Sequence, residues 1–156
     1  MPSETPTDLT LRPATPDDAA SVTAVHLASR AAAVRSATMP ASVHRDDEAL
    51  PWLTERLAID EVWVAEATGR VVGYVRLTDE GMDDLYVVPE QAGRGIGSAL
   101  LGLAQARRPR GFGLWVFEVN APARAFYAAH GLVEVERTDG SDNEEGAPDV
   151  RVVWSP

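Results

Sequence analysis

Three glycines at alternate positions, Gly93, Gly95 and Gly97, separate an apolar run from an amphipathic one in the stretch LYVVPEQAGRGIGSALLGLA. Glycine is costly inside regular structure because it loses more backbone freedom on folding than any other residue. The glycines therefore indicate a junction, at which a strand ends and a helix begins. Leu100 and Leu103 follow Ile96 at helical spacing, which predicts that helix.

The rest of the chain predicts alternating helices and strands. Helices are expected at residues 15–34, 46–59, 96–108 and 121–130. Strands are expected at residues 9–15, 61–67, 70–78, 82–90, 112–119, 132–137 and 149–154, with a hairpin turn at Thr68 and Gly69. This order, βααβββαβαββ, predicts an α/β sandwich with a mixed sheet.

Length and composition predict one soluble domain. The chain has 156 residues, 45% of them hydrophobic, which is enough for a single core. We expect one domain over residues 1–156, with residues 1–8 flexible. There are no cysteines, no signal peptide and no apolar run near the ~20 residues that span a bilayer. These features predict a cytoplasmic protein that does not bind membranes.

The charge of the chain predicts the kind of partner. Its net charge is −10, with 24 acidic residues against 14 basic ones, and every basic residue is arginine. A negative protein repels the nucleic-acid backbone, so we expect no nucleic acid as partner. The same field favours cationic partners, amines among them. The alternative is that the negative surface serves only to keep the protein soluble.

The glycine stretch also suggests a phosphate site. The first amides of a helix have no partner within the helix, and glycines allow a phosphate to approach them. Arg94 would add a charge-assisted bond. A Walker loop needs a lysine, and the dinucleotide fingerprint fails because Ser98 stands where its third glycine belongs. The alternative is an ordinary tight turn.

Three motifs in order resemble the GNAT superfamily of acyl-CoA-dependent N-acyltransferases over nearly the whole chain. The family has a Q/R-x-x-G-x-G/A motif, matched here from Ala92 to Gly97 with alanine in the first position. LYVVPE precedes this motif, and an N-x(6)-Y-x(3)-G pattern from Asn120 through Tyr127 to Gly131 follows it. The resemblance implies an α/β (α+β) fold with a mixed, mostly antiparallel sheet, splayed central parallel strands and helices on both faces.

The resemblance also implies acetyl-CoA as acyl donor, and homodimers are common in such folds. The diphosphate would rest on the loop at residues 93–98, and the pantetheine arm would pair with one of two splayed strands, at residues 85–88 and 113–119. The residues expected to bind the cofactor are Leu85, Tyr86, Val87, Val88, Gly93, Arg94, Gly95, Ile96, Gly97, Ser98, Asn120 and Tyr127.

Acetyl transfer needs an activated carbonyl and a stabilised leaving thiolate. A backbone N–H near Val87 is the expected oxyanion donor, worth on the order of 3 kcal/mol. Tyr127 is the expected partner of the thiolate. Reference pKa values of about 10 for tyrosine and about 8.5 for a thiol favour hydrogen bonding over full proton transfer. Asn120 is expected both to cap its helix and to contact the cofactor. The alternative for Tyr127 is a half-buried core aromatic.

The general base stays open among several candidates, and a solvated carboxylate is the alternative reading of each acid. The candidates are Asp83, Asp84, Glu118, His44, Glu144 and Glu145. Alternation along the strand makes the access of Glu118 to the cleft doubtful. His26 and His130 are expected to be structural. No spacing resembles a metal site, so no metal is expected.

Two anionic segments, residues 46–48 and 142–145, are expected to flank the acceptor side of the cleft. They predict that His44, Asp47, Glu144 and Glu145 contact a cationic acceptor, for which a small-molecule amine is the hypothesis. A protein N-terminus is the nearest alternative. A regulatory module that binds acyl-CoA without turnover is another.

Overall fold

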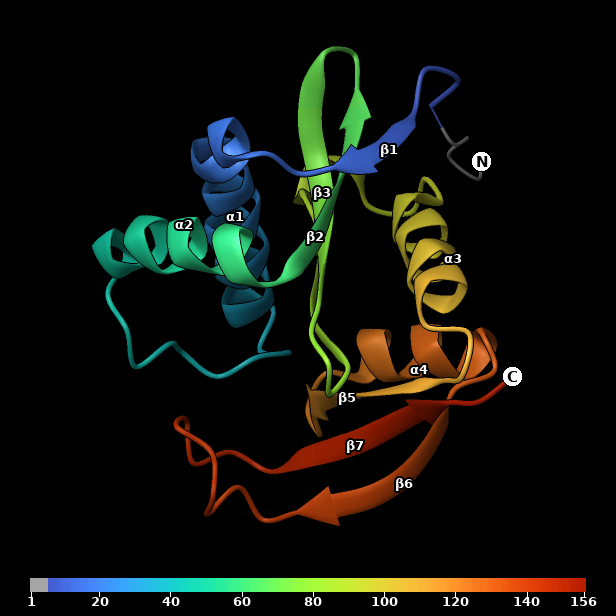
Figure 1. Ribbon diagram of the computed structural model, residues 1–156. Helices are drawn as coiled ribbons and strands as arrows, with labels where there is room; N and C mark the ends of the chain where they lie inside the picture. The colour runs from blue at the N-terminus through green and yellow to red at the C-terminus, as the bar shows by residue number, and fades with distance from the viewer. Residues whose placement is uncertain (1–5) are drawn as a thin grey trace.

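The computed structural model describes residues 6–156 and shows two antiparallel sheets (Figure 1). The first has the order β1-β2-β3-β4, and its strands are β1 (Thr10–Pro13), β2 (Glu61–Ala67), β3 (Arg70–Leu77) and β4 (Met82–Val87). The second has the order β5-β7-β6, and its strands are β5 (Phe112–Phe117), β6 (Val133–Thr138) and β7 (Asp149–Trp154).

Four helices pack on these sheets. They are α1 (Ala19–Arg35), α2 (Ala49–Ile59), α3 (Ile96–Arg107) and α4 (Ala121–Ala129). In Figure 1, α1 and α2 cover one face of the first sheet, α3 lies on the opposite side, and α4 lies between α3 and the second sheet. The element order and the fold class predicted from the sequence are confirmed. Of residues 1–8, which are expected to be flexible, residues 1–5 lie outside the described residues.

Glycine sets the point at which the two sheets meet. β4 and β5 run parallel but share only one bridge, between Gly81 and Gly113. A Cβ on Gly81 would lie 2.0 Å from the carbonyl oxygen of Gly113, so no side chain fits there. Beyond this bridge the two strands diverge, because their other neighbours, β3 and β7, belong to different sheets. The expected splay of the central strands is therefore present.

The core fills the space between the helices and the first sheet. Apolar residues of α1 and α3 are fully buried against β-branched residues of the strands, and this burial is the main stabilising term of the fold. The helix residues are Val22 and Val25 on α1 and Leu100 and Leu101 on α3. The β2–β3 hairpin turns at Thr68 and Gly69, as the sequence predicts, and both have positive φ.

A partly buried ion pair stabilises the start of α1. Arg12 on β1 donates two hydrogen bonds to Asp18, of 2.8 and 2.9 Å, and the amide of Thr15 donates a third, of 2.7 Å. The bonds from Arg12 lower the pKa of Asp18 to about 2, although burial opposes them. The carboxylate therefore stabilises the folded state above the unfolded pKa, and this contribution is lost as the pH falls through the folded one.

Asp18→Asn removes this pH-dependent term. The stability difference between the wild type and Asp18→Asn should shrink by about 2 kcal/mol as the pH falls from about 5 to about 2. Urea unfolding of both proteins across this range measures the difference. A difference that does not change with pH would contradict the role given to the ion pair.

Candidate functional site

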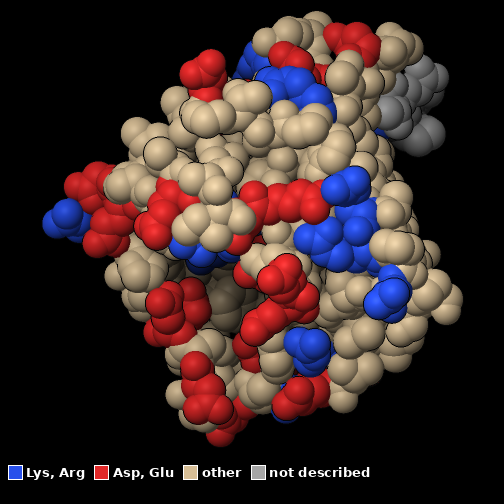
Figure 2. Space-filling model, viewed as in Figure 1, with Lys and Arg blue, Asp and Glu red and all other residues tan. Residues whose placement is uncertain are grey.

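The larger of two neighbouring cavities opens between α1, α2 and the β6–β7 loop and has a volume of about 740 Å³. Figure 2 shows acidic side chains around a hollow on this face of the molecule. The acidic residues that line the cavity are Asp46, Glu48, Asp84, Glu144 and Glu145. Three arginines, Arg30, Arg35 and Arg45, line it as well. Acidic groups therefore outnumber basic ones on its wall.

The smaller cavity, of about 230 Å³, lies where β4 and β5 diverge. Leu85 and Tyr86 line it from β4, and Asn120 and Tyr127 line it from the start and the body of α4. Asp84 and Arg30 line both cavities. The two cavities are therefore neighbours at these two side chains.

The free backbone edge of β4 faces the gap between the sheets. The amide of Val88 donates to the carbonyl of Val72 on β3, over 2.8 Å. Because backbone groups alternate in direction along an antiparallel strand, the amides of Leu85 and Val87 point away from β3. The carbonyl of Val87 accepts a 2.9 Å hydrogen bond from Ser29 of α1. This edge provides amides for an oxyanion or for an extended ligand.

The glycine loop supplies a second group of amides. Gly93 and Gly95 adopt left-handed backbone conformations, with φ of 76° and 83°, and α3 begins directly after Gly95. The first amide bonded back to this loop is that of Ala99, at 3.0 Å from the carbonyl oxygen of Gly95. Within residues 6–156, five preceding amides have no hydrogen-bond acceptor: those of Gly93, Gly95, Ile96, Gly97 and Ser98.

Two side chains of this loop are held by neighbours. Arg94 donates a 3.0 Å hydrogen bond to Gln91. The hydroxyl of Ser98 lies 3.0 Å from Nε2 of His130, whose Nδ1 is 2.7 Å from the carbonyl oxygen of Phe126. His130 is therefore structural, as the sequence predicts, and it ties the end of α4 to the loop.

Asp84 belongs to a buried network on the face of the first sheet beneath α1. Its Oδ2 accepts hydrogen bonds from Tyr74, of 3.1 Å, and from Nε of Arg76, of 2.8 Å. Arg76 also donates to Asp60, over 2.7 Å, and lies 4.9 Å from the ring centre of Trp52. Oδ1 of Asp84 has no partner among the described residues. Arg76 compensates the charge of the carboxylate, and Oδ1 stays available to a ligand.

Tyr127 lines the smaller cavity with a hydroxyl that has no hydrogen-bond partner within the described part of the chain. Burial, followed by the proximity of Tyr86, raises the pKa of Tyr127. Asn120 caps α4 by accepting a 3.2 Å bond from the amide of Ala123, and it lines the same cavity. The side chains of both residues thus lie where a ligand between β4 and β5 would contact them.

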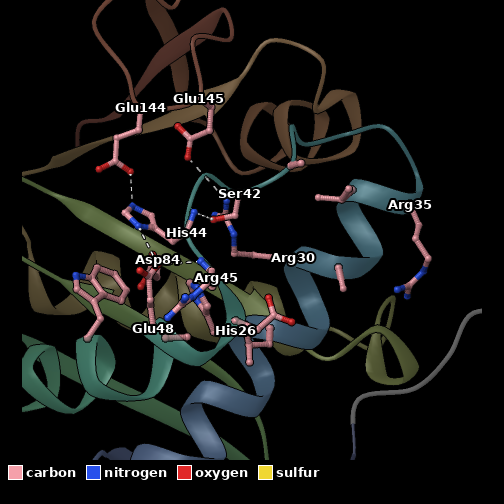
Figure 3. Close-up of a pocket in the computed structure, with 17 residues that line it drawn as sticks. His26, Arg30, Arg35, Ser42, His44, Arg45, Glu48, Asp84, Glu144 and Glu145 are labelled. Carbon is pink, nitrogen blue, oxygen red and sulfur yellow. Dashed lines mark hydrogen bonds and ion pairs between the residues drawn. The ribbon is translucent and has the colours of Figure 1, made fainter.

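Ion pairs cross the mouth of the larger cavity (Figure 3). His44 lies 2.9 Å from Glu144 and 3.3 Å from Glu48, and it thereby links the segment before α2 to the β6–β7 loop. The hydrogen bond to Glu144 raises the pKa of His44. Glu145 lies 4.0 Å from Arg30. Three of the four residues expected to bind the acceptor, His44, Glu144 and Glu145, therefore line one cavity.

The structure does not bring Asp47 or Glu118 to either cavity. Asp47 pairs with Arg45 over 3.1 Å on the exposed side of its turn, whereas its neighbours in the sequence line the cavity. Glu118 lies just past the end of β5, and its carboxylate is 3.4 Å from Arg137. Glu48 lines the larger cavity in place of Asp47, and Asp84, which was also a candidate from the sequence, lines both cavities.

The part that α1 plays was not predicted from the sequence. His26 and Arg30 both line the larger cavity, and Arg30 also donates a 3.1 Å hydrogen bond to the hydroxyl of Tyr86. The sequence did contain a signal for these two residues, because they follow the fully buried Val22 at i, i+4 spacing along the helix. Polar residues on the buried stripe of a helix indicate a polar site in the packed region.

Residues 6–156 contain neither a membrane-spanning helix nor a cluster of metal-binding side chains. No helix in this range is long and apolar enough to cross a membrane. The same residues contain no group of three or more histidine, aspartate or glutamate side chains arranged to hold a metal ion.

Comparison with known proteins identifies the family. The sequence model of one protein family, the acetyltransferase (GNAT) domain, matches residues 58–134 of this chain. A peptidyl-lysine N-acetyltransferase of Escherichia coli strain K12, YiaC, is 37% identical over 77 residues, which are 49% of this chain and 52% of YiaC. The chain thus spans about half the length of that relative. An uncharacterized N-acetyltransferase of Archaeoglobus fulgidus is 36% identical over 108 residues, or 60% of this chain and 72% of the relative.

Solved structures share the fold. A GCN5-related N-acetyltransferase from Rhodopseudomonas palustris superposes with a TM-score of 0.77 and 26% identity, over 100% of this chain and 99% of the other. The structure of yncA from Salmonella typhimurium, solved with its cofactor acetyl-CoA, gives a TM-score of 0.72 at 22% identity, over 96% and 94% of the two chains. The resemblance inferred from the motifs is therefore confirmed, and the chain belongs to the GNAT family of acetyltransferases.

Proposed function

We propose that this protein transfers an acetyl group from acetyl-CoA to the primary amine of a small cationic molecule, by direct attack in a ternary complex. The observation that carries the proposal is the meeting of the two cavities at Asp84, with Tyr127 lining one and acidic side chains lining the other. The structure of yncA, a protein of the same fold, was solved with acetyl-CoA, which supports acetyl-CoA as the acetyl donor here.

Acetyl-CoA is the donor substrate and supplies a reactive thioester. The unpaired amides at residues 93 and 95–98 would hold its diphosphate, because helix-terminal amides and the helix dipole both favour anions. The free edge of β4 would pair with the pantetheine arm and offer the amide of Leu85 or Val87 to the carbonyl oxygen. Donors fixed before the reaction stabilise the charge that develops there.

The acceptor amine would occupy the larger cavity. Oδ1 of Asp84 would bind it at the junction with the smaller cavity, and Glu48, Glu144 and Glu145 would attract its positive charge. Asp84 is better suited to hold the amine than to take its proton, since Arg76 already compensates its charge. Glu118 and Asp47 have no part in this proposal.

Tyr127 would hydrogen-bond to the thiolate that leaves. Burial raises the pKa of Tyr127 above its ordinary value, which is itself above that of a thiol. Full proton transfer to sulfur is therefore uphill, and donation of a hydrogen bond is the role that we assign to this hydroxyl. The cytoplasmic location and the homodimer stay predictions.

A panel of acceptors tests the proposal. With acetyl-CoA, we expect the purified protein to acetylate polyamines and other small cationic amines, with release of free thiol. The panel should include a lysine-containing peptide, because YiaC is a peptidyl-lysine N-acetyltransferase, and a peptide with a free N-terminus. Acetylation confined to either peptide would overturn the choice of a small molecule. If calorimetry shows that acetyl-CoA binds but no acceptor is acetylated, the proposal that the protein is an enzyme would be overturned and a regulatory module favoured.

A further inference from the structure

A chain of three side chains links β4 to α1 beneath the larger cavity. The hydroxyl of Tyr74 donates to Oδ2 of Asp84 over 3.1 Å, and Nδ1 of His26 lies 2.9 Å from the same hydroxyl oxygen. Since the one proton of the hydroxyl is directed to the carboxylate, the oxygen accepts from His26, and Nδ1 carries the proton. The neutral ring then has its lone pair on Nε2.

The ring of His26 is fixed on both sides and exposed to the cavity. Tyr86 meets it edge-on at an interplanar angle of 84°, with ring centres 5.4 Å apart, and Trp52 lies 6.0 Å away on α2. His26 lines the larger cavity, and within the described residues its Nε2 has no hydrogen-bond partner. In the view of Figure 3, Glu144 and Glu145 border the cavity at the top and His26 at the bottom.

The charges around His26 favour the neutral ring. Burial lowers the pKa of His26 below its ordinary value; Asp84 alone opposes this, while Arg30 and Arg76 add to it. The ionisable groups that face it come from α1, β3 and β4: Arg30, Tyr74, Arg76, Asp84 and Tyr86. At neutral pH the lone pair of Nε2 is thus free to accept a proton.

Four other acidic groups of the cavity are already engaged. Glu144 pairs with His44, Glu145 faces Arg30, and Glu48 accepts a 2.8 Å bond from the amide of Arg45. Asp84 is compensated by Arg76. His26 differs from these groups because its free acceptor atom belongs to a ring with no ion-pair partner among the described residues, and Tyr74 links that ring to Asp84, which lines both cavities.

We infer that His26 is the general base of the reaction and that Tyr74 and Asp84 are positioning residues that fix its tautomer. This rests on the proposed function. The amine reacts with its attacking nitrogen uncharged. This nitrogen forms a bond to the thioester carbonyl carbon and gains a positive charge, one of its protons passes to Nε2, and the carbon–sulfur bond breaks with its electron pair on sulfur. The thiolate leaves hydrogen-bonded to Tyr127 and takes a proton from water, and the imidazolium returns its proton to water through the cavity.

Turnover of His26→Gln tests the inference. A general base contributes on the order of 100-fold or more to turnover, so kcat should fall by about that factor while KM for acetyl-CoA stays within about twofold. The wild-type kcat should fall at acid pH with one ionisation below about 6.5, and this acid limb should be absent from the variant. His44→Gln is the matched control: it should raise KM for the amine and keep the acid limb.

Tyr74→Phe isolates the positioning role. It leaves the base in place but removes the bond that orients it, so kcat should fall by roughly tenfold while the acid limb remains. If His26→Gln had the same kcat as the wild type and the same fall in kcat at acid pH, the inference would be overturned and the proposed function would still stand. A wild type that acetylates no acceptor would overturn both.

Nitrogen NMR of the wild type, selectively labelled at histidine, tests the same geometry without any variant. We expect His26 to be neutral at pH 7 with the proton on Nδ1. A proton on Nε2 would overturn the inference even if His26→Gln failed to fold.

Discussion

Gly93→Asp is expected to raise the dissociation constant for acetyl-CoA on the order of 100-fold. The new carboxylate would lie against the diphosphate in a loop whose amides have no acceptor within residues 6–156. At an effective dielectric constant near 20, two charges about 5 Å apart repel by about 3 kcal/mol, and about 1.4 kcal/mol corresponds to a tenfold change in affinity. Isothermal calorimetry with acetyl-CoA measures the change.

Gly69→Asp is a matched control for backbone strain. Gly69 has φ of 73° against 76° for Gly93, and a Cβ added at either position would have no heavy atom within 4 Å beyond its chain neighbours. The two substitutions add the same charge at the same strain, but Gly69 lies in the β2–β3 turn. Equal loss of affinity in both variants would show that strain or net charge is responsible, and would contradict a diphosphate site at the loop.

Tyr127→Phe is expected to lower kcat on the order of 100-fold and to leave the affinity for acetyl-CoA nearly unchanged. The lost hydrogen bond would be formed only as charge develops on sulfur, so its loss should appear in turnover rather than in binding. Steady-state kinetics together with calorimetry separate the two. A turnover equal to that of the wild type would remove Tyr127 from the mechanism.

Stability provides the control for this substitution. The hydroxyl of Tyr127 has no partner among the described residues, so its removal should leave the melting temperature unchanged or raise it. Tyr86→Phe removes a hydroxyl that accepts from Arg30 and should cost about 1 kcal/mol. A marked loss of stability in Tyr127→Phe would show that the hydroxyl is hydrogen-bonded within the folded protein and is not free to meet the thiolate.

Local patterns predicted the elements of this fold correctly. Helical spacing in α3, the turn at Thr68 and Gly69, and the cap at Asn120 each depend on residues a few positions apart, and all are present in the structure. The glycine loop was predictable for the same reason. Its left-handed residues, Gly93 and Gly95, have backbone angles that other residue types rarely adopt.

The side-chain networks depend on pairs far apart in the chain, and the sequence could not reveal them. His26 and Tyr74 are separated by 48 positions, and His44 and Glu144 by 100. Asp84 could be suspected as a candidate but not distinguished from Asp83, because only the packing against α1 decides which of the two is buried. Strand alternation did predict the doubtful access of Glu118.

Amide NMR of the protein saturated with coenzyme A tests the central claim most directly. If the diphosphate rests on the loop and the pantetheine arm pairs with β4, the amide resonances of residues 93–98 and of Leu85 and Val87 should shift together. If none of these amide resonances shifts, whether or not resonances elsewhere in the protein do, the account is contradicted.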